Sequence, residues 1–399
     1  MPGDRLAAPD VLRGLAIAGT FATNVWVFAD PRGPGAVFAG FSAGWWLDTA
    51  LRAVANGKFL ALLTLLFGIG MELQYRSAVR RGLRWPGRYL ARAGILFTEG
   101  LLHYVLVFEF DVLMGYAIAS VLVAWLVGRS ARVRTAAACV AGAVTVLLVV
   151  GASVATAGST GADVPLPPYP ATWTGQVAAR LTDPLLYRVE LVLIVPSAVA
   201  LFLAGSALLR AGLFDTAAVT LRRRLIGTGA VGVVLTLLTT LGGAPWFLVE
   251  RYLVAPLVAL GLLGLVPEVL ARLRGPAGPV RRGLTALGRT AMTCYVGQNV
   301  VAAVLFGAWG LGLAGALVGV AGAAADRGGR RGVGPRRRRL GRGGGVVVAR
   351  PRPRPAGGAH PRPAQRSITS QPPWCSDTVN DRPVRSPIRV RTRSSKTRT

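Results

Sequence analysis

Long runs of uncharged residues recur along the chain and leave few folds open to it. One of them, TAAACVAGAVTVLLVVGASVATAG at 135–158, has 24 residues without a charge, whereas a helix needs only about 18–20 apolar residues to cross a bilayer. Charged residues make up 16% of the chain, against about 25% in ordinary soluble domains. A string of soluble domains is therefore excluded, and the sequence predicts an all-α, polytopic transmembrane bundle.

Apolar runs of nearly twenty residues predict about ten spans. We expect them at 11–28, 57–75, 89–108, 112–128, 135–157, 189–209, 225–243, 251–270, 289–307 and 308–325. The first run is not expected to be a signal peptide, because it contains Arg13, begins at Asp10 and lacks a small-x-small cleavage site.

Lysine and arginine alternate between the two sides of this predicted bundle. With the N-terminus inside, the connections on the inner side and the N-terminus hold 18 basic residues, whereas the outer connections hold six. Cytoplasmic loops of membrane proteins carry such an excess of basic residues. The sequence therefore predicts an inside N-terminus and an even number of spans.

A change in composition divides the chain into a transmembrane domain at 1–325 and a tail at 326–399. The tail has 20 basic and three acidic residues and is rich in Arg, Gly and Pro, so we expect it to be disordered. Two origins stay open: a genuine polybasic segment drawn to anionic membrane lipids, or GC-rich DNA translated out of frame. Nucleic acid is not expected as a partner, since Trp374 is the tail's one aromatic residue.

Cysteine and histidine are too few and too scattered for a metal site. The three cysteines lie far apart and form no CxxC pair, and the chain has only two histidines, His103 and His360. We therefore expect no bound metal and no disulfide framework.

The third predicted span carries three ionisable residues on one face. Steps of seven and four residues separate Arg92, Glu99 and His103, which places them on the same side of a helix. A Glu99 carboxylate one turn below the imidazole would fix its tautomer and make His103 a general base. The alternative is that all three residues bind neighbouring helices and only hold the bundle together.

The first span has a similar polar face. Arg13 and Asn24 are eleven residues apart, close to three helical turns. Arg13, near the inner surface, could bind a phosphate or an anionic donor, and Asn24, near the outer surface, could donate to a substrate carbonyl. A structural pair of Asp10 with Arg13 and an interhelical bond from Asn24 are the alternative.

Two further polar segments could contribute to a binding site. Glu109 and Asp111 flank Phe110 in an otherwise uncharged outer turn; they could receive a cation or a sugar hydroxyl, or form a solvated turn. Gln298 belongs to the unusually polar run GRTAMTCYVGQN at 288–299. Such a helix lines a cavity or binds its neighbours through polar side chains.

Five segments carry a family resemblance, and together they cover residues 10 to about 320. They are DVLRGLAIAGTFATN (10–24), GKFLALLTLLFGIGMEL (57–73), GLLHYVLVFEFDVLMGYAI (100–118), VPSAVALFLAGSALLRAGLF (195–214) and GRTAMTCYVGQNVVAAVLFGAWGLGLAG (288–315). In family order, they resemble the YeiB-like family of bacterial multi-pass membrane proteins, a domain of unknown function that is distantly similar to the membrane acyltransferase superfamily.

That resemblance implies a protein of the bacterial inner membrane that transfers an acyl group from a cytoplasmic donor, acyl-CoA, to a lipid or envelope glycan acceptor. It implies that Arg13 faces the donor, that His103 acts on the acceptor with Glu99 behind it, and that Asn24 lines the acyl path. Two other functions stay open: a transporter or channel with a proton-linked Glu99–His103 site, and a non-enzymatic membrane scaffold.

Overall fold

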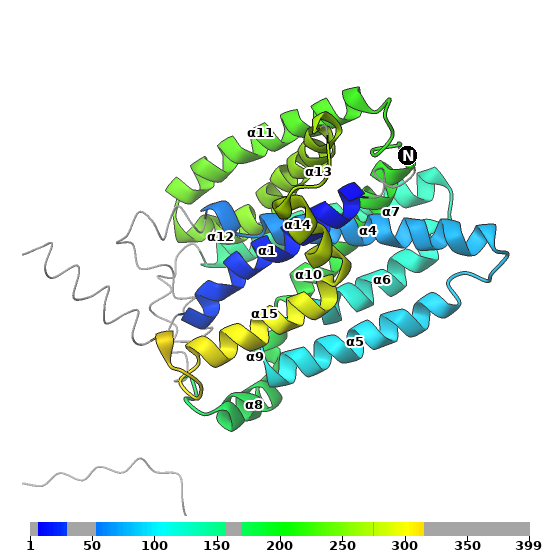
Figure 1. Ribbon diagram of the computed structural model, residues 1–399. Helices are drawn as coiled ribbons and strands as arrows, with labels where there is room; N and C mark the ends of the chain where they lie inside the picture. The colour runs from blue at the N-terminus through cyan, green and yellow to red at the C-terminus, as the bar shows by residue number, and fades with distance from the viewer. Residues whose placement is uncertain (1–6, 30–52, 157–168, 274, 315–399) are drawn as a thin grey trace, which may run out of the picture. The chain divides into compact units, whose positions relative to one another are not determined.

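The computed structural model describes residues 7–29, 53–156, 169–273 and 275–314, and the regular elements of this part are all helical (Figure 1). The longer helices are α1 (Ala7–Ala29), α4 (Lys58–Arg80), α5 (Arg88–Leu106), α6 (Leu113–Val127), α7 (Ala131–Thr156), α10 (Leu191–Arg210), α11 (Val219–Leu241), α13 (Ala255–Arg272) and α15 (Ala291–Phe306). The shorter ones are α8 (Trp173–Thr182), α9 (Pro184–Arg188), α12 (Phe247–Val249), α14 (Pro279–Arg289), the 3-10 turn η2 (Ala244–Trp246) and the π turn η3 (Glu250–Val254).

A helix lies at each of the first nine predicted spans, and these nine are the longer helices named above. The tenth, 308–325, falls largely outside the described residues, as do the tail and the boundary predicted at 325. In the described part, six helical stretches are long and apolar enough to cross a membrane: Ala8–Ala29, Ala53–Arg80, Ala131–Ala155, Pro184–Arg210, Val219–Leu241 and Phe247–Arg272. Helices α6 and α15 are apolar but shorter. The predicted all-α membrane bundle is confirmed, although, in the described part, fewer helices than the expected ten are both long and apolar enough to span a membrane.

Glycines set the closest helix crossings in the bundle. Where α4 crosses α10, a Cβ on Gly68 would lie 2.1 Å from the carbonyl oxygen of Phe202, and one on Gly205 would lie 2.1 Å from that of Leu65. Helices α11 and α13 meet at Gly229 and Gly261 in the same way. Small residues at crossings let helix backbones approach closely, which is how packing holds membrane helices together.

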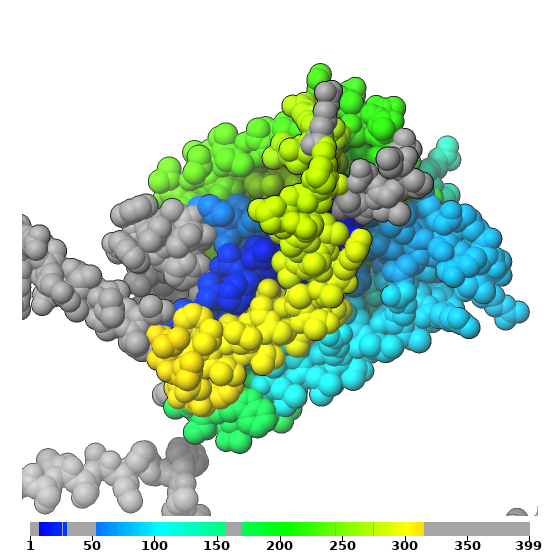
Figure 2. Space-filling view, in the orientation of Figure 1, coloured from blue at the N-terminus to red at the C-terminus, as the bar shows by residue number. Residues whose placement is uncertain are grey.

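Helix α14 is an amphipathic element in a segment that the sequence analysis treated as an inner connection. It packs on α1, and Figure 2 shows α14 and α15 lying over α1 on the visible face. The contact is close, because a Cβ on Gly288 would lie 1.9 Å from the carbonyl oxygen of Asp10. Asp10 lies between two guanidinium groups, 3.1 Å from Arg13 and 3.5 Å from Arg289.

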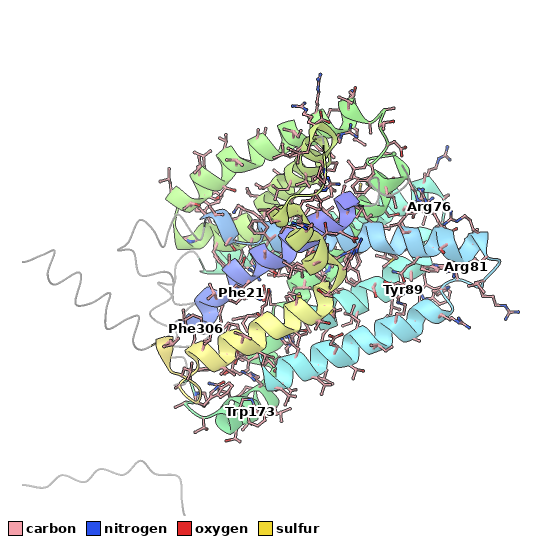
Figure 3. The ribbon with its side chains drawn as sticks, viewed as in Figure 1. Phe21, Arg76, Arg81, Tyr89, Trp173 and Phe306 are labelled. Carbon is pink, nitrogen blue, oxygen red and sulfur yellow. The ribbon has the colours of Figure 1, made fainter. Side chains whose placement is uncertain are left out.

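The two ends of the bundle differ in the side chains that they display. Arg76 and Arg81 project from the C-terminal end of α4, whereas Trp173 on α8 lies at the opposite end, beside the C-terminus of α5 (Figure 3). The indole of Trp173 donates to the carbonyl of Leu106 over 2.8 Å. A turn at 107–112 connects α5 to α6 at this second end, and this turn positions the site.

Candidate functional site

The site centres on a buried pair formed by a histidine and an aspartate. His103 lies in the last turn of α5, and Asp111 follows the turn that reverses the chain into α6. Asp111 Oδ2 is 2.8 Å from His103 Nδ1, and the two residues are 0% and 2% exposed. The other oxygen, Oδ1, accepts from the backbone N–H of Met114 over 3.2 Å. Both carboxylate oxygens are thus bound, so the carboxylate is held in one orientation.

Two asparagines extend this pair across neighbouring helices. Asn299 Nδ2 lies 3.2 Å from His103 Nε2, and Asn299 Oδ1 accepts from Asn24 Nδ2 over 3.1 Å. Because the Asp111 carboxylate accepts at Nδ1, the proton of a neutral ring belongs on Nδ1, and Nε2 is left as an acceptor. The amide orientations fit this tautomer. The network therefore runs Asp111–His103–Asn299–Asn24 and joins α5, α15 and α1.

A groove follows the face of α5 that carries these residues. Its volume is about 750 Å³, and its lining is mostly apolar, with His103, Glu99 and Thr98 as the polar side chains. The lining residues lie on α5 from Ala91 to Leu106 and at Val107 just after it, and Val296 of α15 joins them. The imidazole is thus buried by its neighbours yet reaches the wall of an open groove, as a base that meets a substrate must.

The structure gives Asp111 the place that the sequence analysis expected for Glu99. Glu99 is half-buried on the groove wall, one turn below His103, while the bond to Nδ1 comes from Asp111. Helical spacing shows which residues share the face of α5, but it cannot show that the chain folds back at 107–112. A partner that follows the end of the helix was therefore missed.

Of the two possibilities left open for the turn around Glu109, the solvated polar turn is wrong. Glu109 is 2% exposed, and its Oε1 lies 2.7 Å from Arg180 NH2 and accepts a hydrogen bond from the Tyr169 hydroxyl. Arg180 also donates to the carbonyls of Val105 and Val107. Burial, followed by the nearby Glu109 carboxylate, raises the pKa of Tyr169. Glu109 therefore fastens the segment at 169–182 to the end of α5.

Arg188 binds the same turn through its backbone. Its NH1 donates to the carbonyl of Glu109 over 3.0 Å and its NH2 to that of Asp111 over 2.8 Å. The guanidinium lies 4.6 Å from the centre of the Tyr104 ring. The turn that carries Asp111 is thus held by an arginine that lies almost eighty residues later in the chain.

The remaining predicted residues lie away from this pair. Arg13 binds Asp10 and is eleven residues from Asn24, or about 16 Å along α1. Arg92 is exposed, and it lies eleven residues before His103 on α5. Gln298 donates to Thr20 Oγ1 over 3.4 Å, so it binds α1. The structure therefore brings His103, Glu99, Asn24 and Asp111 to one end, and it leaves Arg13 and Arg92 toward the other.

Sequence reasoning missed the contributions of Asn299, Arg180 and Arg188. Asn299 is fully buried. It ends the polar run GRTAMTCYVGQN at 288–299, and this run is the signal that could have marked it. In the sequence, Arg180 and Arg188 resemble ordinary charged residues of a predicted outer connection, because the neighbouring residues do not indicate which arginine becomes buried. Among the described residues, no group of three or more His, Cys, Asp or Glu side chains could hold a metal ion.

Comparison with known proteins gives matches over about a third of the chain. Residues 208–325 match the family described as "Protein of unknown function (DUF418)". The chain is 28% identical over 137 residues to "Uncharacterized protein YeiB" of Escherichia coli (strain K12), a match that covers 32% of this chain and 32% of that protein. It is 28% identical over 143 residues to "Uncharacterized protein YxaH" of Bacillus subtilis (strain 168), covering 34% and 35%.

No solved structure matches the chain. The matches span about a third of the length of these curated relatives. Their bacterial origin and the apolar helices described above indicate a bacterial membrane protein. The match at residues 208–325 and the two relatives support the YeiB-like DUF418 resemblance that the sequence motifs predict.

Proposed function

We propose that the chain is an acyltransferase-like protein of the bacterial inner membrane, in which His103 is the general base. The observation that carries the proposal is the pair of His103 with Asp111, whose 2.8 Å bond leaves Nε2 as the acceptor of the ring. An imidazole oriented by a buried carboxylate is suited to accept the proton of a hydroxyl. The groove along α5 gives an acceptor access to this ring.

In the proposed reaction, an acceptor hydroxyl in the groove gives its proton to His103 Nε2 as its oxygen attacks the acyl carbon of a thioester. The new C–O bond forms, the C–S bond breaks, and the leaving thiolate takes the proton from the imidazolium. Asn299 Nδ2 occupies Nε2 in the resting structure, so the acceptor hydroxyl replaces that contact when it binds. The Asp111 carboxylate stabilises the imidazolium that forms between the two steps.

The donor in this proposal is acyl-CoA, which approaches from the inner end. Arg13 and Arg289 share one carboxylate, Asp10, so this cluster keeps a net positive charge that can attract phosphate groups. Arg92, exposed on α5, adds positive charge toward the same end of the bundle. Asn24, which is linked to His103 through Asn299, would line the acyl path at the end of the bundle that holds the base. The acceptor is a membrane lipid or an envelope glycan.

The test combines a product search with a matched pair of variants. Lipid and cell-wall extracts of cells with and without the protein are compared by mass spectrometry for an acyl ester. The purified protein in lipid vesicles is then assayed for release of free CoA thiol from acyl-CoA. His103→Gln should abolish both signals, whereas Arg272→Gln, a change at an exposed residue, should leave them intact. Full activity of His103→Gln would overturn the proposal.

A second function is favoured by the position of Glu99. This carboxylate and His103 lie on the same groove wall, one turn apart, and ionisable pairs within membrane helices mark proton-linked transport sites. A transporter would accumulate an unmodified substrate in vesicles in response to a pH gradient, and Glu99→Gln would abolish that accumulation. If neither transfer nor accumulation responds to changes at Glu99 or His103, the scaffold function is favoured instead.

A further inference from the structure

The segment at 169–188 contacts the site through two arginines, Arg180 and Arg188, which bind different groups. Arg180 binds the Glu109 side chain and the last carbonyls of α5, so it holds the segment against the end of that helix. Arg188 binds the main-chain carbonyls on both sides of Phe110. Of the two arginines, Arg188 is the one that binds Asp111, the residue that orients His103.

The guanidinium of Arg188 is rigid and planar, and its two N–H donors point along fixed directions. Bound to the carbonyls of Glu109 and Asp111 at 3.0 and 2.8 Å, it fixes the distance between those two carbonyls and with it the course of the turn. The guanidinium carbon lies 4.6 Å from the centre of the Tyr104 ring, and this contact holds the guanidinium in place. The orientation of the Asp111 side chain therefore depends on a group that does not itself touch His103.

We propose that Arg188 is the positioning residue of the site, which holds the turn so that the Asp111 carboxylate selects the Nδ1-protonated form of His103. The consequence for catalysis rests on the proposed function, because only a general base needs Nε2 free of its proton. The expected effect on the tautomer does not rest on the proposed function, since it follows from the hydrogen bonds alone. The two can therefore be tested apart.

The chain has only two histidines, which makes the tautomer directly measurable. In a His360→Gln background, labelling with 15N-histidine leaves His103 as the single labelled residue. The 15N chemical shifts of its ring, recorded in detergent or lipid at alkaline pH, distinguish the two neutral forms, Nδ1–H and Nε2–H. Asp111, Glu99 and Tyr295 are ionisable side chains close to this ring.

Two Arg188 variants and one matched control test the proposal. Arg188→Met keeps a stem that packs on Tyr104 but removes the donors, and we expect a mixture of both tautomers. Arg188→Lys keeps the charge but cannot bind two carbonyls as a planar fork, and we expect an intermediate ratio. Arg180→Met is the control: the protein should unfold at a lower temperature, while His103 keeps the Nδ1–H form.

Activity adds a second readout. If acyl transfer is confirmed, Arg188→Met should lower kcat by up to about a hundredfold, the loss expected when a catalytic group is displaced by about 1 Å, with little change in KM. A wild-type tautomer ratio in folded Arg188→Met would overturn the proposal. If that variant does not fold, an unchanged ratio in Arg188→Lys overturns it equally. Should the tautomer shift as expected while no wild-type transfer is found, the proposed function fails and the positioning role stands.

Discussion

The carboxylate of Asp111 lies 2.8 Å from Nδ1 of His103, although eight residues and the end of a helix separate the two in sequence. Both side chains are almost completely buried. A buried carboxylate is costly unless its oxygens are bound, and here the second oxygen is bound by the N–H of Met114. The pair therefore combines a structural role at the start of α6 with the orientation of the imidazole.

The first prediction concerns Asp111→Asn. The amide keeps the shape of the carboxylate, but its single oxygen can accept from only one of the two N–H donors, His103 Nδ1 and the Met114 backbone. It also lacks the negative charge that stabilises an imidazolium. We expect acyl transfer to fall by about 10²–10⁴-fold, the contribution typical of general acid–base catalysis, with the helical circular dichroism unchanged. CoA release from vesicle-bound protein measures it. Transfer at the wild-type rate would show that His103 is not the base, or that it needs no charged partner.

The second prediction concerns the crossing of α11 and α13. A Cβ on Gly229 would lie 2.4 Å from the Cα of Gly261, so Gly229→Val must separate the two helices. Overpacking of this kind costs about 1–3 kcal/mol and occasionally more, and we expect a lower unfolding temperature in detergent. Gly227→Val is the matched control, since nothing lies within 4 Å of a Cβ at that position of the same helix. Equal effects of the two changes would contradict the crossing.

The third prediction concerns a buried ion pair at the start of α4. Lys58 Nζ lies 2.7 Å from Glu250 Oε1, and both side chains are less than a tenth exposed. Lys58→Met leaves the carboxylate buried and unpaired, which costs about 3–5 kcal/mol when a buried pair is broken from one side. The double variant Lys58→Met/Glu250→Leu should recover most of this loss in thermal unfolding. A double variant as unstable as the single one would mean that packing, and not the unpaired charge, is responsible.

The helices could be predicted because their signal is local. An apolar run of about twenty residues can satisfy its backbone in a bilayer only as a helix, so nine helix positions follow from composition alone. The short helix α14 was missed because its segment is dense in arginine and resembles a cytoplasmic loop. In the structure its Gly288 packs closely against Asp10 at the start of α1, a contact between distant segments that the sequence does not show.

The site could be predicted only as far as one helix extends. The seven- and four-residue steps placed Glu99 and His103 on one face, and both line the groove. The contacts of the imidazole come from elsewhere: Asp111 requires the reversal after α5, and Asn299 is 196 residues away in sequence. Such partners depend on how helices pack, which neither periodicity nor charge counts can specify.

The fourth prediction concerns which end of the bundle faces the cytoplasm. The basic connections predict that Gly278 lies inside and Thr182 outside. Each is exposed, so single cysteines at these positions, in a chain whose three native cysteines are replaced by alanine, can be labelled in sealed cells with an impermeant maleimide. We expect Thr182→Cys to react at once and Gly278→Cys only after permeabilisation. Labelling of both cysteines from outside would contradict the predicted inner and outer ends of the bundle, on which the roles of Arg13 and His103 depend. Labelling in the reversed order would turn the His103 site toward the cytoplasm, where it could no longer act on an envelope acceptor.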